Sequence, residues 1–357
     1  MIPGSRIDQI LAGAAIGDAT TQSALIVRET LRSMGYRSDL YAPGDRIMPE
    51  LAAQCRDLAD YRAETRYGVI HHYGVWSPAA EVYMGAAERK ILVYHNVTPP
   101  HFFKGYSDRM VALLDEARRR LPEVARASRD IWAVSDFNAG ELRSLGFTGV
   151  KVFPLPFRRD ALTAKPDPGI LAKLAAPLTT FLTVGRLAPN KRIERLLRAF
   201  AWYHHAINPF SRLVIVGSQH SAPRYVAYLR WLAHELKTPN IDMEGFVWPE
   251  ALAAYYQRAD LLVSTSDHEG YCAPLLEAMH YGVPVLAHDI GGIPEALGGA
   301  GARYRELPPR LLGELMHTLT EKDILRRAVL ASQEKRLHEL DARRIDSELR
   351  DLLNHQP

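Results

Sequence analysis

Apolar runs of strand length alternate with longer stretches of helical spacing through the first part of the chain. The runs contain few polar positions, which is typical of parallel strands buried on both faces of a sheet. Strands are expected at residues 6–17, 38–42, 69–74, 90–96, 130–135 and 150–153. Helical spacing covers residues 23–34, 106–126 and 138–145, the first of them after a polar turn at 18–22. This order predicts an α/β domain with a doubly wound parallel sheet.

The second part of the chain repeats this alternation without a detectable repeat of sequence. Strands are expected at residues 179–184, 212–216, 241–246, 259–266 and 283–287. Helices are expected at residues 192–204, 224–236, 249–258 and 274–281, near Pro294, and in a charged tail from residue 311. Pro154, Pro156, Pro166 and Pro168 separate the two series, and such a cluster favours a hinge. We therefore predict an N-terminal domain over residues 1–157 and a C-terminal domain over residues 158–335.

Composition narrows the possible functions. The 357 residues are 47% hydrophobic and 24% charged, as in ordinary globular proteins, and the net charge of +3 is too small to favour nucleic acid. The two cysteines, Cys55 and Cys272, show no metal-binding spacing, which fits a reduced cytoplasmic setting. No apolar run approaches the roughly 20 residues of a membrane span. Residues 10–17 follow Arg6 as a signal peptide would, but they are too short and lack a cleavage site, so we expect a buried strand.

Two glutamates flank the start of a predicted helix in residues 267–282, which read D-H-E-G-Y-C-A-P-L-L-E-A-M-H-Y-G. Pro274 suits the first turn of a helix, and Gly282 suits the residue just past its end. Glu269 is then expected on a loop at the carboxyl end of a strand, and Glu277 about one turn into the helix. The free N–H groups and the dipole of a helix start favour phosphate. This arrangement predicts a site that holds a sugar nucleotide by both ends.

A basic turn follows the first strand of the second half, at Val184-Gly185-Arg186-Leu187-Ala188-Pro189-Asn190-Lys191-Arg192. Gly185 at the strand end allows a ligand to approach the backbone closely. Arg186 and Lys191 flank the turn, and fixed cations stabilise a leaving group that gains negative charge. Other strands end in Val216-Gly217-Ser218 and in Glu244-Gly245-Phe246-Val247. Neither H-E-x-x-H nor D-x-D is present, so no metal site is expected.

The segment from Glu269 to Glu277 resembles the Glu-x7-Glu signature of family 4 retaining glycosyltransferases, and the basic turn resembles that family's G-R-x-x-x-x-K motif. The resemblance implies a GT-B fold, in which two Rossmann-like domains face each other across a cleft. It further implies that a C-terminal segment, residues 336–357, packs back on the first domain. Gly291-Gly292-Ile293-Pro294-Glu295 resembles a further loop of the family, although Ala296 stands where a threonine is common.

The resemblance also assigns roles to residues. Arg186 and Lys191 would hold the donor diphosphate, Glu277 the ribose, and Glu269 the transferred sugar; together with His95, the residues on the catalytic side are Glu269, Arg186 and Lys191. The donor-binding set is Gly185, Arg186, Lys191, Gly217, Ser218, Phe246, Val247, Glu269, Gly270, Tyr271, Cys272, Ala273, Pro274, Leu275 and Glu277. The acceptor-side set is Gly17, Asp18, Ala19, Tyr73, Ser77, His95 and Asn96, in loops similar to those of a bacterial branch of the family.

That branch assembles surface polysaccharide and O-antigen and includes many mannosyltransferases. The resemblance therefore implies transfer of a hexose, with GDP-mannose as the expected donor, to a saccharide or polyprenyl-linked saccharide, with retention and without metal. Arg118, Arg119, Arg120, Arg126 and Arg129 form a basic face that would suit anionic lipid at the cytoplasmic membrane. A solvated face on an ordinary surface helix explains the same residues.

Several alternatives stay open at this point. A UDP-sugar would fit the same motifs, and so would a nucleotide-sugar-binding protein that has lost its activity. A phosphorylase or epimerase can share the fold, although no signature of a lysine-bound pyridoxal site is present. A dehydrogenase is disfavoured because no G-x-G-x-x-G opens either half.

Overall fold

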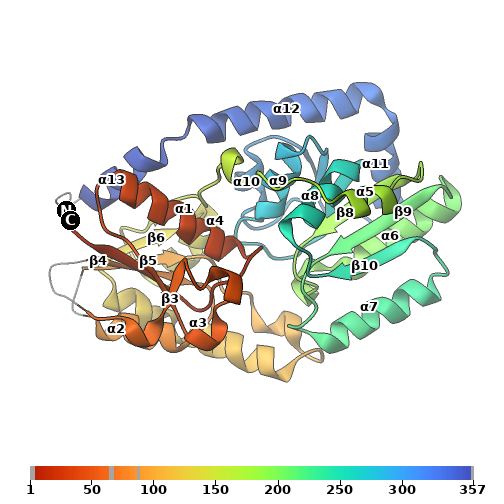
Figure 1. Cartoon of the computed structure of the whole chain (residues 1–357). Helices are drawn as coiled ribbons and strands as arrows, with labels where there is room; N and C mark the ends of the chain where they lie inside the picture. The colour runs from red at the N-terminus through yellow and green to blue at the C-terminus, as the bar shows by residue number, and fades with distance from the viewer. Residues whose placement is uncertain (1–4, 64–67, 87–88, 355–357) are drawn as a thin grey trace. The chain divides into compact units, whose positions relative to one another are not determined.

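The computed structural model describes residues 5–63, 68–86 and 89–354 and contains two parallel sheets (Figure 1). The first sheet has the strand order β3-β2-β1-β4-β5-β6-β7 and the second β10-β9-β8-β11-β12-β13. The first is built from β1 (Ile7–Leu11), β2 (Leu40–Ala42), β3 (Cys55–Asp57), β4 (Gly68–Tyr73), β5 (Arg89–Tyr94), β6 (Asp130–Ala133) and β7 (Lys151–Val152). The second is built from β8 (Thr179–Val184), β9 (Ser211–Val216), β10 (Ile241–Gly245), β11 (Leu261–Ser264), β12 (Val285–His288) and β13 (Ala302–Tyr304). The predicted α/β fold with two doubly wound sheets is confirmed.

Helices alternate with the strands along the chain, as the connections between parallel strands require. Those of the first half are α1 (Ala19–Ser33), α2 (Pro78–Gly85), α3 (Asp108–Ala127) and α4 (Asp136–Ser144). Those of the second half are α5 (Pro168–Lys173), α6 (Ile193–Ala206), α7 (Pro223–Glu235), α8 (Pro249–Arg258), α9 (Ala273–His280), α10 (Ile293–Leu297), α11 (Pro309–Glu321), α12 (Asp323–Ala342) and α13 (Ile345–Asn354). Proline opens several of them, because its missing N–H costs nothing at a helix start. Among the described helices none is long and apolar enough to cross a membrane.

Contacts divide the chain into two compact units. Unit 1 comprises Met1–Pro99, Ala112–Arg158 and Asp341–Pro357, and unit 2 comprises Pro100–Val111 and Arg159–Leu340. The C-terminal helix α13 packs against α1 in unit 1, and the Arg89 guanidinium donates to the Leu353 carbonyl at 2.6 Å. Figure 1 shows the sheet of unit 1 between α1 and α13 on one face and α2 and α3 on the other.

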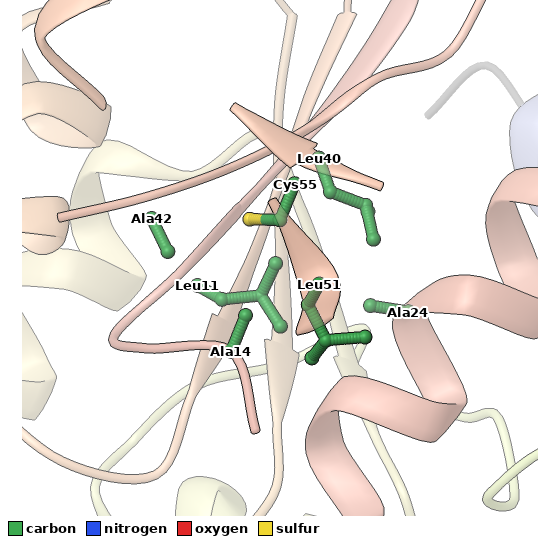
Figure 2. Packing of buried hydrophobic residues seen from close by; sticks show 7 residues of the cluster. All are labelled: Leu11, Ala14, Ala24, Leu40, Ala42, Leu51 and Cys55. Carbon is green, nitrogen blue, oxygen red and sulfur yellow. The ribbon is translucent and has the colours of Figure 1, made fainter. Parts of the chain in front are cut away.

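The core of unit 1 near its sheet edge is small and aliphatic. Figure 2 shows side chains from β1, β2, β3, α1 and the loops beside them converging there: Leu11, Ala14, Ala24, Leu40, Ala42, Leu51 and Cys55. Burial raises the pKa of the Cys55 thiol to about 11, so this cysteine is a packing residue with no thiolate at neutral pH.

Helix α1 begins earlier than the apolar spacing predicted. The expected strand at 6–17 stops at Leu11, and the helix expected from residue 23 starts at Ala19. Asp18 is the reason, because its carboxylate accepts from the backbone N–H of Thr21 at 2.9 Å and so caps the helix.

Candidate functional site

All the strands of the second sheet are parallel, so their carboxyl ends meet along one edge, where the predicted donor residues lie. Three glycines bring these ends close together. Gly185 N–H donates to the Val216 carbonyl at 2.9 Å, and Gly217 N–H donates to the Gly245 carbonyl at 2.7 Å. A Cβ on Gly217, whose φ is +149°, would lie 1.9 Å from the Gly185 carbonyl oxygen. Glycine is therefore required at position 217, and the strand ends form a close-packed floor.

The basic turn is tied to the loop that precedes α9. Its last residues form a 3₁₀ turn, Pro189–Lys191, followed by Arg192 at φ 51°. The Asn190 carbonyl accepts from Asp267 N–H at 2.8 Å, and the Asn190 amide donates to the His268 carbonyl at 3.1 Å. The Thr265 hydroxyl is within 3.0 Å of the Lys191 carbonyl. These bonds fix the backbone that carries Lys191.

Lys191 and Glu269 form a buried ion pair. Lys191 Nζ lies 2.5 Å from Glu269 Oε1, and the Ser266 hydroxyl donates to the same oxygen at 2.7 Å. Glu269 is 8% exposed. Burial alone would raise the pKa of this carboxyl, but Lys191 and the hydrogen bonds from Lys191 and Ser266 outweigh it, so its pKa lies below its ordinary value. Glu269 is therefore a carboxylate at neutral pH.

The sequence placed Lys191 and Glu269 in neighbouring parts of the donor site, and the structure brings them into direct contact. Arg186 behaves differently from Lys191. Its side chain is exposed, and within the described part of the chain no hydrogen bond or ion pair engages its guanidinium. A Cβ on Gly185 would lie 3.6 Å from Lys191 Nζ, so the Lys191 ammonium lies beside the residue that precedes Arg186. Both cations are therefore found at the carboxyl end of β8. One of them is neutralised by Glu269 and the other is available to an anion.

Glu277 lies on α9 against a tyrosine that the motif did not indicate. The Tyr256 hydroxyl on α8 donates to Glu277 Oε2 at 2.8 Å. The Tyr256 ring stacks on Tyr281 with centroids 5.2 Å apart and an angle of 7°. Burial raises the pKa of Glu277 above its ordinary value, and the hydrogen bond from Tyr256 offsets only part of this effect. This carboxyl is therefore the more readily protonated of the two glutamates.

The residue just before α9 has a backbone conformation that is rare for a residue with a side chain. Cys272 precedes the helix with φ 76°, in the left-handed region that side chains rarely adopt. Burial, and then the charge of Glu269, raise the pKa of the Cys272 thiol well above its ordinary value, so it offers no thiolate. Gly291 and Gly292 pack against this loop, because a Cβ on either would lie within 2.4 Å of the Glu269 or Gly270 carbonyl oxygen.

The other predicted donor residues differ in what they present. Tyr271 and Leu275 are buried, at 4% and 0% exposed, so their side chains serve packing. The Ser218 carbonyl accepts from Leu187 N–H at 2.9 Å. Phe246 is 42% exposed and packs edge-on against Trp248, which the sequence did not single out. Val247, Ala273 and Pro274 are half-buried, and Ala296 is buried in α10.

In unit 1, two predicted acceptor-side residues are buried, which argues against their contacting an acceptor. Tyr73 is 0% exposed, and its hydroxyl donates to the Ala117 carbonyl at 2.6 Å. Ser77 is 2% exposed and precedes α2. The apolar pattern could not show this, because both faces of a parallel strand are covered. Gly17, Asp18 and Ala19 are exposed, although the Asp18 carboxylate is engaged as the helix cap.

His95 and Asn96 lie at the carboxyl end of β5. The His95 ring is 2.8 Å from His72 on β4, a partner that sequence reasoning missed. Asn96 adopts φ 83°, and its amide donates to Asn138 at 3.0 Å and to Glu141 at 3.2 Å. Asn96 thus holds the turn after β5 in a conformation that positions His95.

The arginines of α3 are largely paired. Arg118 binds Glu141, Arg119 binds Glu116, and Arg120 lies 3.0 Å from Glu123. Arg120 also lies over the Trp76 ring, 4.4 Å from its centroid. These pairs favour the solvated face over a lipid-binding one. In the described ranges, no three His, Cys, Asp or Glu side chains are placed to hold a metal ion.

Comparison with known proteins connects this site to a family. Residues 173–306 match the family described as Glycosyl transferases group 1. The GDP-mannose-dependent alpha-mannosyltransferase of Mycolicibacterium smegmatis is 37% identical over 109 residues, which are 30% of this chain and 25% of the relative. The serotype-specific mannosyltransferase WbdA of Escherichia coli is 25% identical over 197 residues, 55% of this chain and 21% of the relative. This chain thus spans about a quarter or less of these relatives.

Solved structures show the fold. Sucrose-phosphate synthase from Thermosynechococcus elongatus superposes with a TM-score of 0.73 at 17% identity, covering 98% of each chain. HepE from Anabaena, solved in complex with UDP and glucose, gives a TM-score of 0.73 at 19% identity over 98% of this chain and 99% of that one. The chain thus has the GT-B fold, and residues 173–306 of its second unit match the family described as Glycosyl transferases group 1.

Proposed function

We propose that this protein is a retaining glycosyltransferase that moves a hexose, mannose from GDP-mannose, to a saccharide or polyprenyl-linked saccharide in surface polysaccharide assembly. The observation that carries the proposal is the Lys191–Glu269 pair ahead of α9, with exposed Arg186 on the same strand end. Lys191 and Arg186 together with the Glu269 carboxylate give a net positive charge of about one beside a helix start. This charge suits a diphosphate whose negative charge grows as the glycosidic bond breaks. The relatives named for GDP-mannose and mannosyl transfer support mannose.

The two glutamates have environments that suit different roles. Glu269 is ionised and fixed by Lys191 and Ser266, so it can orient sugar hydroxyls and stabilise positive charge at the sugar ring. Glu277 is held by Tyr256 and suits acceptance of hydrogen bonds from the ribose hydroxyls. In this proposal the leaving phosphate takes the proton of the acceptor hydroxyl on the same face, which gives retention. Arg186, Lys191 and the dipole of α9 take the place of a metal ion, and the reaction takes place in the cytoplasm.

A panel of nucleotide sugars tests the proposal. Each is added to the full-length protein, and the melting temperature and release of nucleoside diphosphate are measured with and without EDTA. GDP-mannose should raise the melting temperature most and turn over equally in EDTA. A larger response to a UDP-sugar would move the donor assignment toward the sugar nucleotide seen in HepE. Turnover restored only by Mg²⁺ or Mn²⁺ would reject the metal-free mechanism.

Single substitutions at Arg186 and Glu269 test where the diphosphate and the transferred sugar bind. Arg186→Ala should lower kcat by roughly a hundredfold, the loss expected for one preformed charge-stabilising donor. Glu269→Gln should lower kcat more than donor affinity, because it keeps the shape and removes the charge. Arg327→Ala is the matched control, an exposed arginine on α12. Equal turnover in Arg186→Ala and in the control would place the diphosphate elsewhere.

A further inference from the structure

Three neighbouring strands of unit 1 carry a continuous chain of hydrogen bonds. Gln9 on β1 donates through Nε2 to the Ala24 carbonyl at 3.0 Å. His72 on β4 places Nε2 2.8 Å from Gln9 Oε1 and Nδ1 2.8 Å from Nε2 of His95, just past β5. Gln9 is 0% exposed and His72 2% exposed. The chain therefore runs from a helix carbonyl in the interior to the carboxyl edge of the sheet.

The direction of each bond follows from its buried end. The Ala24 carbonyl can only accept, so Gln9 must direct its N–H₂ there and its carbonyl oxygen toward His72. That oxygen can only accept, so His72 carries its proton on Nε2. A neutral His72 then has a bare Nδ1, which accepts from His95, and His95 in turn carries its proton on Nε2.

His72, His95 and the neighbouring His71 are neutral. Burial, followed by the proximity of His71, lowers the pKa of His95 to about 3, and burial lowers the pKa of His72 well below its ordinary value. His71, which precedes His72 on β4, donates to the Ile10 carbonyl at 3.0 Å, and burial lowers its pKa to about 4. No described carboxylate pairs with any of the three, and the hydrogen bond from His71 to the Ile10 carbonyl offsets only part of its burial.

We propose that Gln9 and His72 are positioning residues that hold His95 in its Nε2–H tautomer, so that His95 presents Nδ1 as a hydrogen-bond acceptor to a saccharide hydroxyl. This inference rests on the proposed glycosyl transfer. None of the described residues hydrogen-bonds His95 Nδ1, which leaves it for a ligand. A bare ring nitrogen accepts from a hydroxyl and repels phosphate and carboxylate oxygens. The sugar bound here is thus expected to place a neutral hydroxyl, and no anionic group, against His95.

The tautomer can be measured without any substrate. Full-length protein labelled with ¹⁵N-histidine is studied by long-range ¹H–¹⁵N correlation, which distinguishes protonated from bare ring nitrogens. In the wild type, His95 should show a protonated Nε2 and a bare Nδ1, unchanged from pH 8 to pH 5. A proton on Nδ1, or formation of imidazolium within this range, would overturn the proposal.

Two variants of His72 make the test specific. In His72→Leu the acceptor for His95 Nε2–H is lost, and His95 should populate both tautomers. In His72→Asn the amide oxygen can occupy the place of Nδ1, and the Nε2–H tautomer should be retained. With the donor identified by the nucleotide-sugar panel, kcat/KM should fall roughly tenfold in His72→Leu, the effect of one neutral hydrogen bond, and recover in His72→Asn.

The outcomes separate this inference from the proposed function. A fixed tautomer in a protein that transfers no sugar would reject the glycosyl transfer and leave the relay intact. Turnover that is equal in His72→Leu and the wild type, with the tautomer released, would reject the role of His95 Nδ1. An unchanged tautomer in a folded His72→Leu protein would reject the relay itself.

Discussion

Replacing Lys191 with methionine should destabilise unit 2 in a pH-dependent way. The change keeps an unbranched side chain of nearly the same length and removes the ammonium that lies 2.5 Å from Glu269 Oε1. The lysine and glutamate side chains are 20% and 9% exposed, so solvent screens the pair weakly. Removing the lysine leaves a buried carboxylate that has lost its ion-pair partner and keeps the hydrogen bond from the Ser266 hydroxyl.

The size of the effect is limited by protonation. With an ordinary Glu pKa of about 4.3, protonating the carboxyl at pH 7 costs about 3.7 kcal/mol, which caps the carboxylate's penalty in the variant. In the wild type the folded pKa of Glu269 is lowered, so its contribution to stability is present above the unfolded pKa and constant between pH 7 and pH 5. In Lys191→Met the opposing charge is lost, so burial outweighs the hydrogen bond from Ser266 and raises that pKa, and stability recovers as pH falls. The difference between the two proteins should therefore shrink by up to about 2.7 kcal/mol from pH 7 to pH 5.

Urea unfolding at both pH values measures this difference. Lys173→Met is the matched control, because Lys173 Nζ also lies 2.5 Å from a carboxylate, that of Glu244, but the two side chains are 47% and 22% exposed. The control should lose no more than about 1 kcal/mol. Equal losses in the two variants, or a loss in Lys191→Met that does not change with pH, would show that burial does not set the strength of the Lys191–Glu269 pair.

Other contacts give predictions of their own. Tyr256→Phe removes the hydrogen bond to Glu277 and should weaken donor binding roughly tenfold by calorimetry, with little effect on turnover at saturating donor; a loss confined to kcat would contradict a ribose-binding role. Gly217→Ala brings a Cβ within 1.9 Å of the Gly185 carbonyl oxygen and should lower the melting temperature far more than Gly299→Ala. Gly299 also has a positive φ, but a Cβ there would meet nothing within 4 Å. Equal losses of melting temperature would mean that the strain of a positive φ, and not the close contact, sets the cost. Tyr73→Phe should cost about 1 kcal/mol of stability and leave kcat unchanged, because its hydroxyl is buried away from any ligand; a selective loss of kcat would return Tyr73 to the acceptor side.

The sequence was sufficient for the fold and for the edge of the sheet at which the candidate site residues lie. Periodicity and glycine or proline stops place Glu269 and Lys191 at strand ends, and parallel strands bring those ends together. It could not pair side chains that are distant in the chain. Tyr256 reaches Glu277 from another helix, and His72 reaches His95 from the neighbouring strand. Such pairs depend on rotamers and on register, which hydrophobic spacing leaves undetermined.

Tyr73 shows the same limit within one strand. It ends an apolar run, and a position at the carboxyl end of a parallel strand can face a ligand or the core. Here β4 keeps Tyr73 inside, and Gly74 is the first residue of the loop. The capping role of Asp18 could have been predicted, because aspartate is a common residue just before the first turn of a helix. The apolar spacing of α1, which begins later, concealed it.

The division into units has a consequence for how this protein can be recombined with a relative. The chain passes from one unit to the other after residues 99, 111, 158 and 340, so neither unit is a continuous stretch of sequence. A single crossover at residue 158 would transfer most of unit 2 and leave Pro100–Val111 behind with the other parent. That segment supplies Tyr106, whose ring packs edge-on against Tyr225 at 5.1 Å. A chimera that exchanges unit 2 at this one crossover therefore has to keep a compatible aromatic residue at position 106, even though it lies in the part of the sequence that was not exchanged.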